Sequence, residues 1–494
     1  MSPVQLAALA VVVPLIAAPA AVLVRGATAA WAIATAACGF AFAAALMLAT
    51  DVAAHGTLSY ALGSWPAPWG IEYRIDALSA FVLVLVSGIA TVVAAFARRS
   101  AAAELPADQL YLFYAMFCLC AAGLLGMTAT GDAFNLFVFM EIASLSSYVL
   151  IALGRDRRAL VAAYQYLILG TIGATFFVIG VGMLYLATGT LNLADMAGRL
   201  AGVPDSRPVL AALAFITVGV SLKLALFPLH LWLPNAYAYA PSAVTAFLAA
   251  TATKVSIYVL LRFYFSVFGA QVVVEDMPMP QILLVLSLVA IASASLVAIW
   301  QTDLKRLFAY SSVAQVGYIT LGISLASPDG LTAAIVHLFN HGVTKGALFL
   351  LIGGIAMRAG GAATLEAVRG LGRTMPLTSL GIVIAGLSLI GIPGTAGFIS
   401  KWFLVLAAMQ AGHWWLAGFV VLTSLIAVAY VWRFVEAAYL AEPGPAAPRA
   451  GEAPAAMLAF AWLLVGGCIW FGLDSSLTVA GARRAALLLL GGAP

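Results

Sequence analysis

Five charged residues lie inside otherwise apolar stretches, and their types suit proton transfer. They are one acid and four bases, namely Glu141, Lys223, Lys254, Lys345 and Lys401. A charge at the centre of a membrane helix costs about 2.5–3.5 kcal/mol on insertion scales, so such residues are retained where they pair or function. One glutamate cannot neutralise four lysines, and some of these side chains therefore need a role other than pairing.

A buried lysine can load and release a proton when its neighbour moves. Burial disfavours the charged form of a lysine, whereas a nearby carboxylate favours it. We therefore predict a proton relay in which Glu141 is the acidic partner of Lys223. Ser144 and Tyr148 share the helix face of Glu141, and we expect them to hydrogen-bond its carboxylate. A purely structural ion pair between two helices is the alternative.

Three titratable residues at a spacing of four share one helix face: His337, His341 and Lys345. A lone histidine on an apolar face is usually a satisfied core residue, which is the alternative here, but a stripe of three favours the relay. Zinc binding through the two histidines lacks cysteine or carboxylate support, so we predict no metal site and no cofactor. Lys254 stands among small polar residues that can hold water, and Lys401 would end the path.

The elements that must position these residues are membrane-spanning helices. The chain has 494 residues, of which 64% are hydrophobic and 9% are charged, whereas a soluble domain carries about a quarter charged residues. Apolar runs of at least about 18 residues indicate spanning helices, and we expect fourteen in a single all-α membrane domain, residues 1–494. They centre near residues 14, 39, 87, 118, 143, 174, 218, 255, 289, 315, 343, 393, 426 and 464. The sequence has no phosphate-binding loop and no nucleic-acid-binding pattern.

Two of the expected spans are interrupted. The seventh meets Pro228, and the twelfth carries the segment Gly391–Gly397 in its middle. Backbone groups freed by such breaks are tolerated at membrane depth only where protein or a wet cavity satisfies them. Breaks five spans apart predict two inverted five-helix repeats, spans 4–8 (residues 108–268) and spans 9–13 (residues 278–440), as in many transporters. Two unrelated proline kinks are the alternative.

The distribution of basic residues predicts the orientation of the chain, because loops rich in Lys and Arg lie in the cytoplasm. Twelve such residues fall in the odd-numbered loops: Arg25, Arg98, Arg99, Arg155, Arg157, Arg158, Lys305, Arg306, Arg358, Arg369, Arg373 and Arg449. Five fall in the even-numbered loops and the C-terminal tail: Arg74, Arg199, Arg207, Arg483 and Arg484. We therefore expect a bacterial inner-membrane protein with both termini outside the cytoplasm.

Polar residues near the membrane faces are expected to have structural roles. The segment Asp51–Asp76, rich in Gly, Pro and Trp, is expected to form a structured external loop. Arg262 lies near a membrane face and is interpreted as an anchor or entrance group. Arg433 and Glu436 are three residues apart, and we expect them to form an ion pair.

Three stretches resemble the antiporter-like proton-channel family: Pro228–Ser242, His337–His341 and Gly391–Lys401. This family includes the D and A subunits of Mrp cation/proton antiporters, the M, N and L subunits of respiratory complex I, and membrane subunits of related hydrogenases. The resemblance implies two half-channels, one from each side, joined at the bilayer midplane by buried titratable groups and water. It places these groups on five helices: Glu141 on the fifth, Lys223 on the broken seventh, Lys254 on the eighth, His337 and His341 on the eleventh, and Lys401 on the twelfth.

Within this family, several features look like the Mrp D subunit. They are Met140 before the glutamate, Tyr237, and the segment Thr188–Asp195. The stripe on the eleventh helix speaks against the N subunit, and the lack of a long lateral helix after span 14 excludes the L subunit and the large A subunit. We therefore expect a proton-translocating subunit of a multisubunit monovalent cation (Na⁺)/proton antiporter, with other membrane subunits as partners.

The alternative function belongs to a different class of complex. In it, the chain is a proton-pumping membrane subunit of a complex I-like NADH:quinone oxidoreductase or of a membrane-bound hydrogenase. Electron transfer in other subunits would then drive the protons. The chain carries no pattern for a redox centre under either hypothesis, so the sequence leaves both open.

Overall fold

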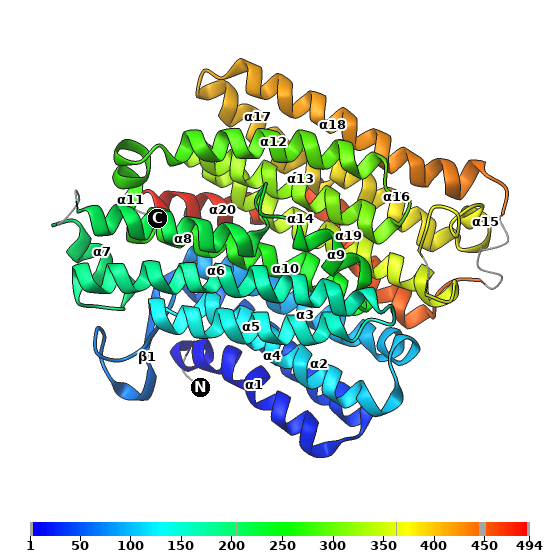
Figure 1. Cartoon of the computed structure of the whole chain (residues 1–494), viewed down its shortest axis with the longest axis horizontal. Helices are drawn as coiled ribbons and strands as arrows, with labels where there is room; N and C mark the ends of the chain where they lie inside the picture. Colours follow the sequence, from blue (N-terminus) through cyan, green and yellow to red (C-terminus); the bar gives the residue numbers. More distant parts are fainter. Residues whose placement is uncertain (1–2, 203–205, 362, 444–450, 492–494) are drawn as a thin grey trace.

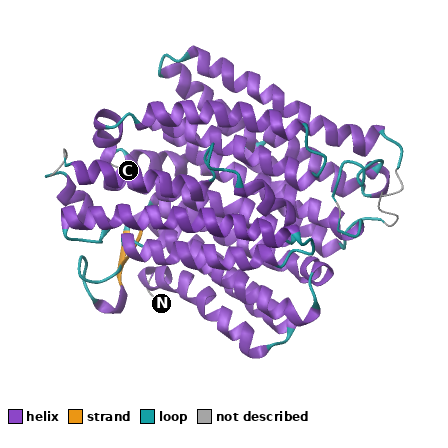
Figure 2. Ribbon diagram, in the orientation of Figure 1, coloured by secondary structure: helices purple, strands orange, loops and turns teal. Residues whose placement is uncertain are grey.

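The computed structural model describes residues 3–202, 206–361, 363–443 and 451–491, so Arg449 lies outside the described residues. Helices make up most of the chain, and β1 and β2 form a short antiparallel pair at one end of the helical bundle (Figure 1, Figure 2). The all-α membrane architecture predicted from the sequence is confirmed by this arrangement.

The longer helices, in chain order, are α1 (Pro3–Val24), α2 (Ala27–His55), α3 (Ala77–Glu104), α4 (Leu110–Ala129), α5 (Ala133–Ala152), α6 (Arg158–Thr188), α8 (Arg207–Leu224), α10 (Ser242–Leu261), α12 (Met279–Ile299), α13 (Leu304–Ser324), α14 (Pro328–Arg358), α16 (Pro376–Ile390), α17 (Ala396–Gln410), α18 (Trp414–Val435), α19 (Ala455–Leu473) and α20 (Ser476–Leu489). The short elements are β1 (Leu58–Ala61), η1 (Leu62–Ser64), β2 (Glu72–Ile75), η2 (Ala107–Gln109), α7 (Leu193–Leu200), α9 (Trp232–Tyr239), η3 (Arg262–Val267), α11 (Gly269–Gln271), η4 (Val272–Asp276), α15 (Leu371–Thr374) and η5 (Glu436–Leu440).

Among the described residues, 12 helices are long and apolar enough to cross a membrane. Two further segments lie where the sequence predicts spans. They are α13, which carries more polar residues, and the pair α16–α17, whose halves have 15 residues each. The count of fourteen spans and the two inverted repeats remain predictions.

Several of the short connecting elements lie at the two ends of the bundle. Figure 1 shows β1, α7 and α11 at one end and α15 at the opposite end, and it marks both termini at the end that carries β1. Between the end of α2 and the start of α3, strands β1 and β2 form an ordered hairpin in which Leu58 pairs with Ile75. The structured loop predicted there is confirmed, and its placement outside the cytoplasm remains a prediction.

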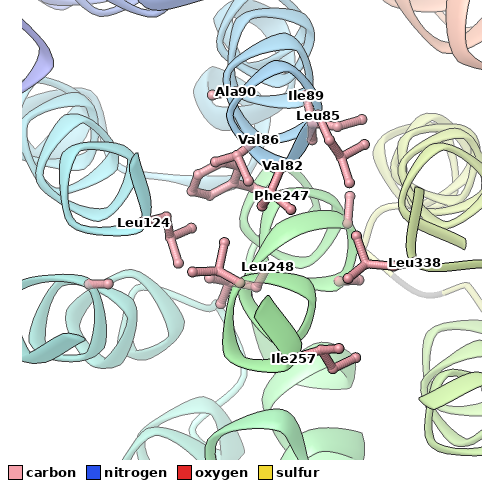
Figure 3. Close-up of a cluster of buried hydrophobic side chains, with 14 of the residues drawn as sticks. Val82, Leu85, Val86, Ile89, Ala90, Leu124, Phe247, Leu248, Ile257 and Leu338 are labelled. Atoms are coloured by element: carbon pink, nitrogen blue, oxygen red, sulfur yellow. The ribbon is translucent and has the colours of Figure 1, made fainter. Parts of the chain in front are cut away.

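The core of the bundle is built around α10 and α14. Nearly all residues of these two helices are buried, and Lys254 of α10 and Lys345 of α14 are completely buried. Figure 3 shows Phe247 and Leu248 of α10 packed against Val82 and Val86 of α3 and against Leu124 of α4. Apolar packing of this kind holds α10 in a fixed position, and the polar groups of the site lie within that framework.

Both interrupted spans predicted from the sequence are present as breaks in the structure. The first lies between α8 and α9, where Ala225 adopts a left-handed conformation and the Trp232 indole donates to the freed carbonyl of Leu222 at 2.9 Å. The second lies between α16 and α17, where Gly391 has φ of 91°. Gly397 approaches α16 so closely that a Cβ atom there would lie 1.7 Å from the Ser388 carbonyl oxygen. Only glycine fits at this second position.

Candidate buried proton-relay site

Lys223 and Glu141 form an ion pair at the first break. The Lys223 Nζ lies 3.7 Å from Glu141 Oε1, and the lysine side chain is 3% exposed whereas that of the glutamate is 25% exposed. Lys223 is the last residue but one of α8, directly before the break, and its side chain lies beside α5. The glutamate lies next to the flank of α5 that exposes Val138 and Leu145, so its carboxylate is partly open to whatever borders this flank.

The predicted hydrogen bonds from Ser144 and Tyr148 to the Glu141 carboxylate are wrong. The Ser144 hydroxyl donates to the Met140 carbonyl at 2.7 Å and accepts from Lys223 Nζ at 2.6 Å. A serine in a helix readily donates to the carbonyl four residues earlier, and this leaves its lone pair for the lysine. Tyr148 OH and Glu141 Oε1 have no hydrogen-bond partner among the described residues.

A small cavity adjoins Lys223. Its lining includes Ser144 and Ser147 of α5 and Ala252 and Ser256 of α10, and it has room for about one water molecule. The two positions on α10 flank Lys254, whose Nζ donates to the Ala249 carbonyl at 2.5 Å and to Thr253 Oγ1 at 3.3 Å. Lys254 is fully buried, so hydroxyl and carbonyl oxygens replace a carboxylate as its partners.

The helix that follows in the path, α14, contacts α10 closely. A Cβ atom at Gly342 would lie 3.0 Å from the Ala250 carbonyl oxygen, so the two backbones nearly touch beside His341. Both ring nitrogens of His341 are buried without a hydrogen-bond partner among the described residues. Buried polar atoms of this kind are rare and mark either water or a functional group.

His337 is held from two sides. Its Nδ1 lies 2.7 Å from Ser400 Oγ of α17, and its Nε2 lies 2.8 Å from Gln315 Oε1 of α13. The imidazole planes of His337 and His341 are stacked with ring centroids 6.2 Å apart. The predicted stripe therefore does lie on one buried face of α14, and it is hydrogen-bonded to Ser400, the residue before Lys401.

The two remaining lysines are bound by oxygen atoms of neighbouring helices. Lys345 Nζ donates to the Phe308 carbonyl at 2.7 Å and to the Ser311 hydroxyl. Lys401 Nζ donates to the carbonyls of Leu389 and Ile390 and to Ser424 Oγ, each at 3.0 Å. An ammonium group has three donors, so Lys401 has a full set of acceptors, whereas Lys345 has two.

All seven predicted residues are thus carried by helices that pack in succession. The order is α8, α10, α14 and α17, each against the next, with α5 joined to α8 through the Glu141–Lys223 pair. Among the described ion pairs, Glu141 with Lys223 is the one that involves these residues. No group of three or more metal-binding side chains occurs in the part of the chain that the structure describes.

Sequence reasoning missed several residues of the site, and it assigned Arg433 to the wrong partner. Gln315, Ser400 and Ser311 carried no signal, because they are polar residues whose partners come from other helices. Arg433 does not pair with Glu436 in the structure, because its guanidinium donates to carbonyls at the end of α12. Arg262, interpreted from the sequence as an anchor or entrance group, is buried in an ion pair with Asp76.

Residues 130–427 match the family model described as "NADH:quinone oxidoreductase/Mrp antiporter, TM". The chain belongs to this family. One relative, NADH-quinone oxidoreductase subunit N of Desulforudis audaxviator (strain MP104C), is 43% identical over 469 residues, which cover 91% of this chain and 93% of the relative. Another, the D subunit of a Na(+)/H(+) antiporter of Alkalihalophilus pseudofirmus, is 34% identical over 74% of this chain and 72% of the relative.

Solved structures of this NADH:quinone oxidoreductase/Mrp family share the fold along nearly the whole chain. A chain of the Mrp complex from Dietzia sp. DQ12-45-1b matches with a TM-score of 0.90 and 28% identity, covering 99% of this chain and 98% of that one. A chain of the archaeal membrane-bound sulfane sulfur reductase matches with a TM-score of 0.89 and 30% identity, covering 98% of each chain. From the stripe on α14, the sequence argued against an N subunit. That argument no longer holds, because one relative of this chain is named as an N subunit.

Proposed function

We propose that this chain carries protons through the membrane along a path from Glu141 to Lys401, as one subunit of a multisubunit complex. The observation that carries the proposal is the succession of buried titratable side chains on α5, α8, α10, α14 and α17. Such residues within membrane helices are retained mainly for ion or proton transfer. The cavity between Lys223 and α10 favours a water-mediated step toward Lys254.

The individual groups have different parts in this path. Glu141 stabilises a proton on Lys223, and movement of the carboxylate away from the ammonium frees that proton for the water next to α10. Lys254 passes it toward His341, Lys345 and His337 on α14. His337 is joined through Ser400 to α17, where Lys401 ends the path.

We propose sodium or another monovalent cation as the counter-ion, in a complex of the Mrp type. Similarity to the Mrp complex chain over 99% of this chain supports this driver. The second candidate is a redox-driven pump, and the 43% identity to a relative named NADH-quinone oxidoreductase subunit N favours it. Both candidate functions use the same proton path. They differ in the energy source, which is a cation gradient in the first and electron transfer in the second.

The first prediction concerns the ion pair and tests the path. In vesicles that contain the assembled complex, Glu141→Ala and Lys223→Ala are each expected to lower driven proton transport about a hundredfold or more, since a positioned proton-transfer group contributes on that scale. Asp156→Asn, at an exposed pair with Arg158, is the matched control and is expected to keep full transport. Normal transport by either relay variant at equal assembly removes the pair from the mechanism.

The same vesicles decide between the drivers. Proton movement started by a sodium gradient, without any electron donor, supports the antiporter. Proton movement that requires electron transfer from a donor to quinone or another acceptor supports the redox-driven pump.

A further inference from the structure

A second buried polar column runs along α10, away from the path described above. Lys254, Tyr258 and Arg262 follow at intervals of four residues, so they share one face of the helix over two turns. All three are buried, and Arg262 stands at the start of η3, a π-helix. Such π-helical segments occur frequently at functional sites. The column leads from a relay lysine to the end of the bundle that carries β2.

The end of this column is closed by a buried ion pair. Arg262 binds the Asp76 carboxylate and donates to Ser79 Oγ at 2.9 Å and to Tyr258 OH at 3.1 Å. Asp76 also caps α3 by accepting from the Ser79 backbone amide at 3.0 Å. The Tyr258 hydroxyl donates its proton to the Thr128 carbonyl at 2.9 Å, and a backbone carbonyl cannot pass that proton on.

Stability alone is a weak reason for this arrangement. Replacing a buried ion pair by well-packed apolar residues is often neutral or stabilising. Asp76 would be the proton carrier at this end of the column, because a carboxylate exchanges protons readily, whereas an arginine side chain remains protonated in proteins. A guanidinium bound to that carboxylate stabilises its ionised form.

We propose that Arg262 keeps the end of the α10 column closed to protons by holding the Asp76 carboxylate permanently ionised. This proposal rests on the proposed function, because a closed column matters only if Lys254 carries protons. By closing this column, Arg262 makes each proton follow the path across α8, α10, α14 and α17, where proton transport is coupled to cation exchange or to electron transfer. Without Arg262, Asp76 binds and releases protons and connects Tyr258 and Lys254 to the nearby aqueous phase.

The second prediction is a proton leak that depends on Asp76. In vesicles with the assembled complex, an imposed pH difference and no driver, Arg262→Gln is expected to raise passive proton flux about a hundredfold, the scale on which a positioned proton carrier acts. Adding Asp76→Asn to this variant is expected to restore a proton-tight membrane, because the carboxyl group that would carry the proton toward Tyr258 is then removed. Lys254→Ala added to Arg262→Gln is expected to stop the leak as well.

A control and two contrary outcomes make the test decisive. Arg199→Gln, at an exposed pair with Asp195 on α7, is expected to stay proton-tight. A tight Arg262→Gln complex overturns the proposal, and so does a leak that persists unchanged after Asp76→Asn, since that leak comes from disrupted packing. If Arg262→Gln does not assemble, Arg262→Met, which also removes the positive charge, is measured in its place: a leak removed by Asp76→Asn supports the proposal, and a tight complex overturns it.

Failure of this proposal is distinguishable from failure of the proposed function. Driven proton transport by the unsubstituted complex tests the function, and passive flux through the Arg262 variants tests the closure. If driven transport is present while the Arg262 variants stay tight, the closure alone is wrong.

Discussion

At the scale of single residues, the buried lysines differ in the oxygen atoms that surround them. Lys223 has a carboxylate nearby, Lys254 has a carbonyl and a hydroxyl, and Lys401 has two carbonyls at the end of α16 as well as a hydroxyl. Last-turn carbonyls attract a cation through the helix dipole. Lys401 is therefore built both to hold a proton and to fasten α17 to α16, and experiment must separate the two roles.

The third prediction separates them by substituting Lys401. An arginine keeps the positive charge and can donate to the same carbonyls, but it does not release a proton near neutral pH. If Lys401 ends the relay, Lys401→Arg blocks driven proton transport about as fully as Lys401→Ala, measured in vesicles at matched assembly. Near-normal transport with arginine and none with alanine would make Lys401 an electrostatic anchor, and the relay would end at another residue.

Prediction from the sequence was successful for features of the fold that a single residue type determines, such as a break in a helix. Proline and glycine located both breaks, and the charges predicted inside apolar runs lie on helices that pack in succession, whereas their role in a relay remains a prediction. The hydrogen-bond partners were not predictable, because Gln315 and Ser400 approach His337 from two other helices, α13 and α17. Ser144 was assigned to the wrong partner because helix spacing shows which residues share a face, but not which acceptor a hydroxyl prefers.

At the scale of elements, the break between α16 and α17 depends on a close backbone approach. The fourth prediction is that Gly397→Ala destabilises the chain by at least about 1–3 kcal/mol, the usual cost of overpacking, because its Cβ would overlap the Ser388 carbonyl. The resulting shift of α17 displaces Ser400 and Lys401, so transport falls as well. Thermal unfolding of the purified complex and vesicle transport measure the two effects.

A glycine in an open helix supplies the control for this substitution. Gly418 lies within α18 and has no atom near the position of an added Cβ. Gly418→Ala is expected to be neutral or to stabilise the helix by up to about 1 kcal/mol. Equal thermal stability of the Gly397 and Gly418 variants would show that the break tolerates a side chain.

At the scale of the whole molecule, the outer helices offer broad apolar flanks. Residues Leu160, Tyr164, Ile168 and Ile172 of α6 are exposed along one side of that helix. Solved relatives of this fold are chains of multisubunit membrane complexes, and partner membrane subunits are therefore expected against such flanks. The partly exposed Glu141 lies on a neighbouring helix, so a partner also changes the surroundings of the first relay group.

The fifth prediction follows from the expectation that partner subunits cover these apolar flanks. The chain purified alone and placed in liposomes is expected to show no cation/proton exchange, because the coupling elements and the covering of Glu141 come from other subunits. The assembled complex, measured in the same liposomes under a sodium gradient or with an electron donor, is the positive control. Robust exchange by the single chain would contradict a multisubunit mechanism.

The deep burial of α14 has a consequence for the biogenesis of the chain. This helix carries Lys345 and two histidines, and a single lysine at a helix centre already costs about 2.5–3.5 kcal/mol in a bilayer. The partners that offset this cost belong to α13 and α17, and α17 is synthesised later than α14. An isolated α14 would therefore be inserted into lipid poorly. The helix becomes stable in the membrane only when the neighbouring helices bind its charged and polar side chains.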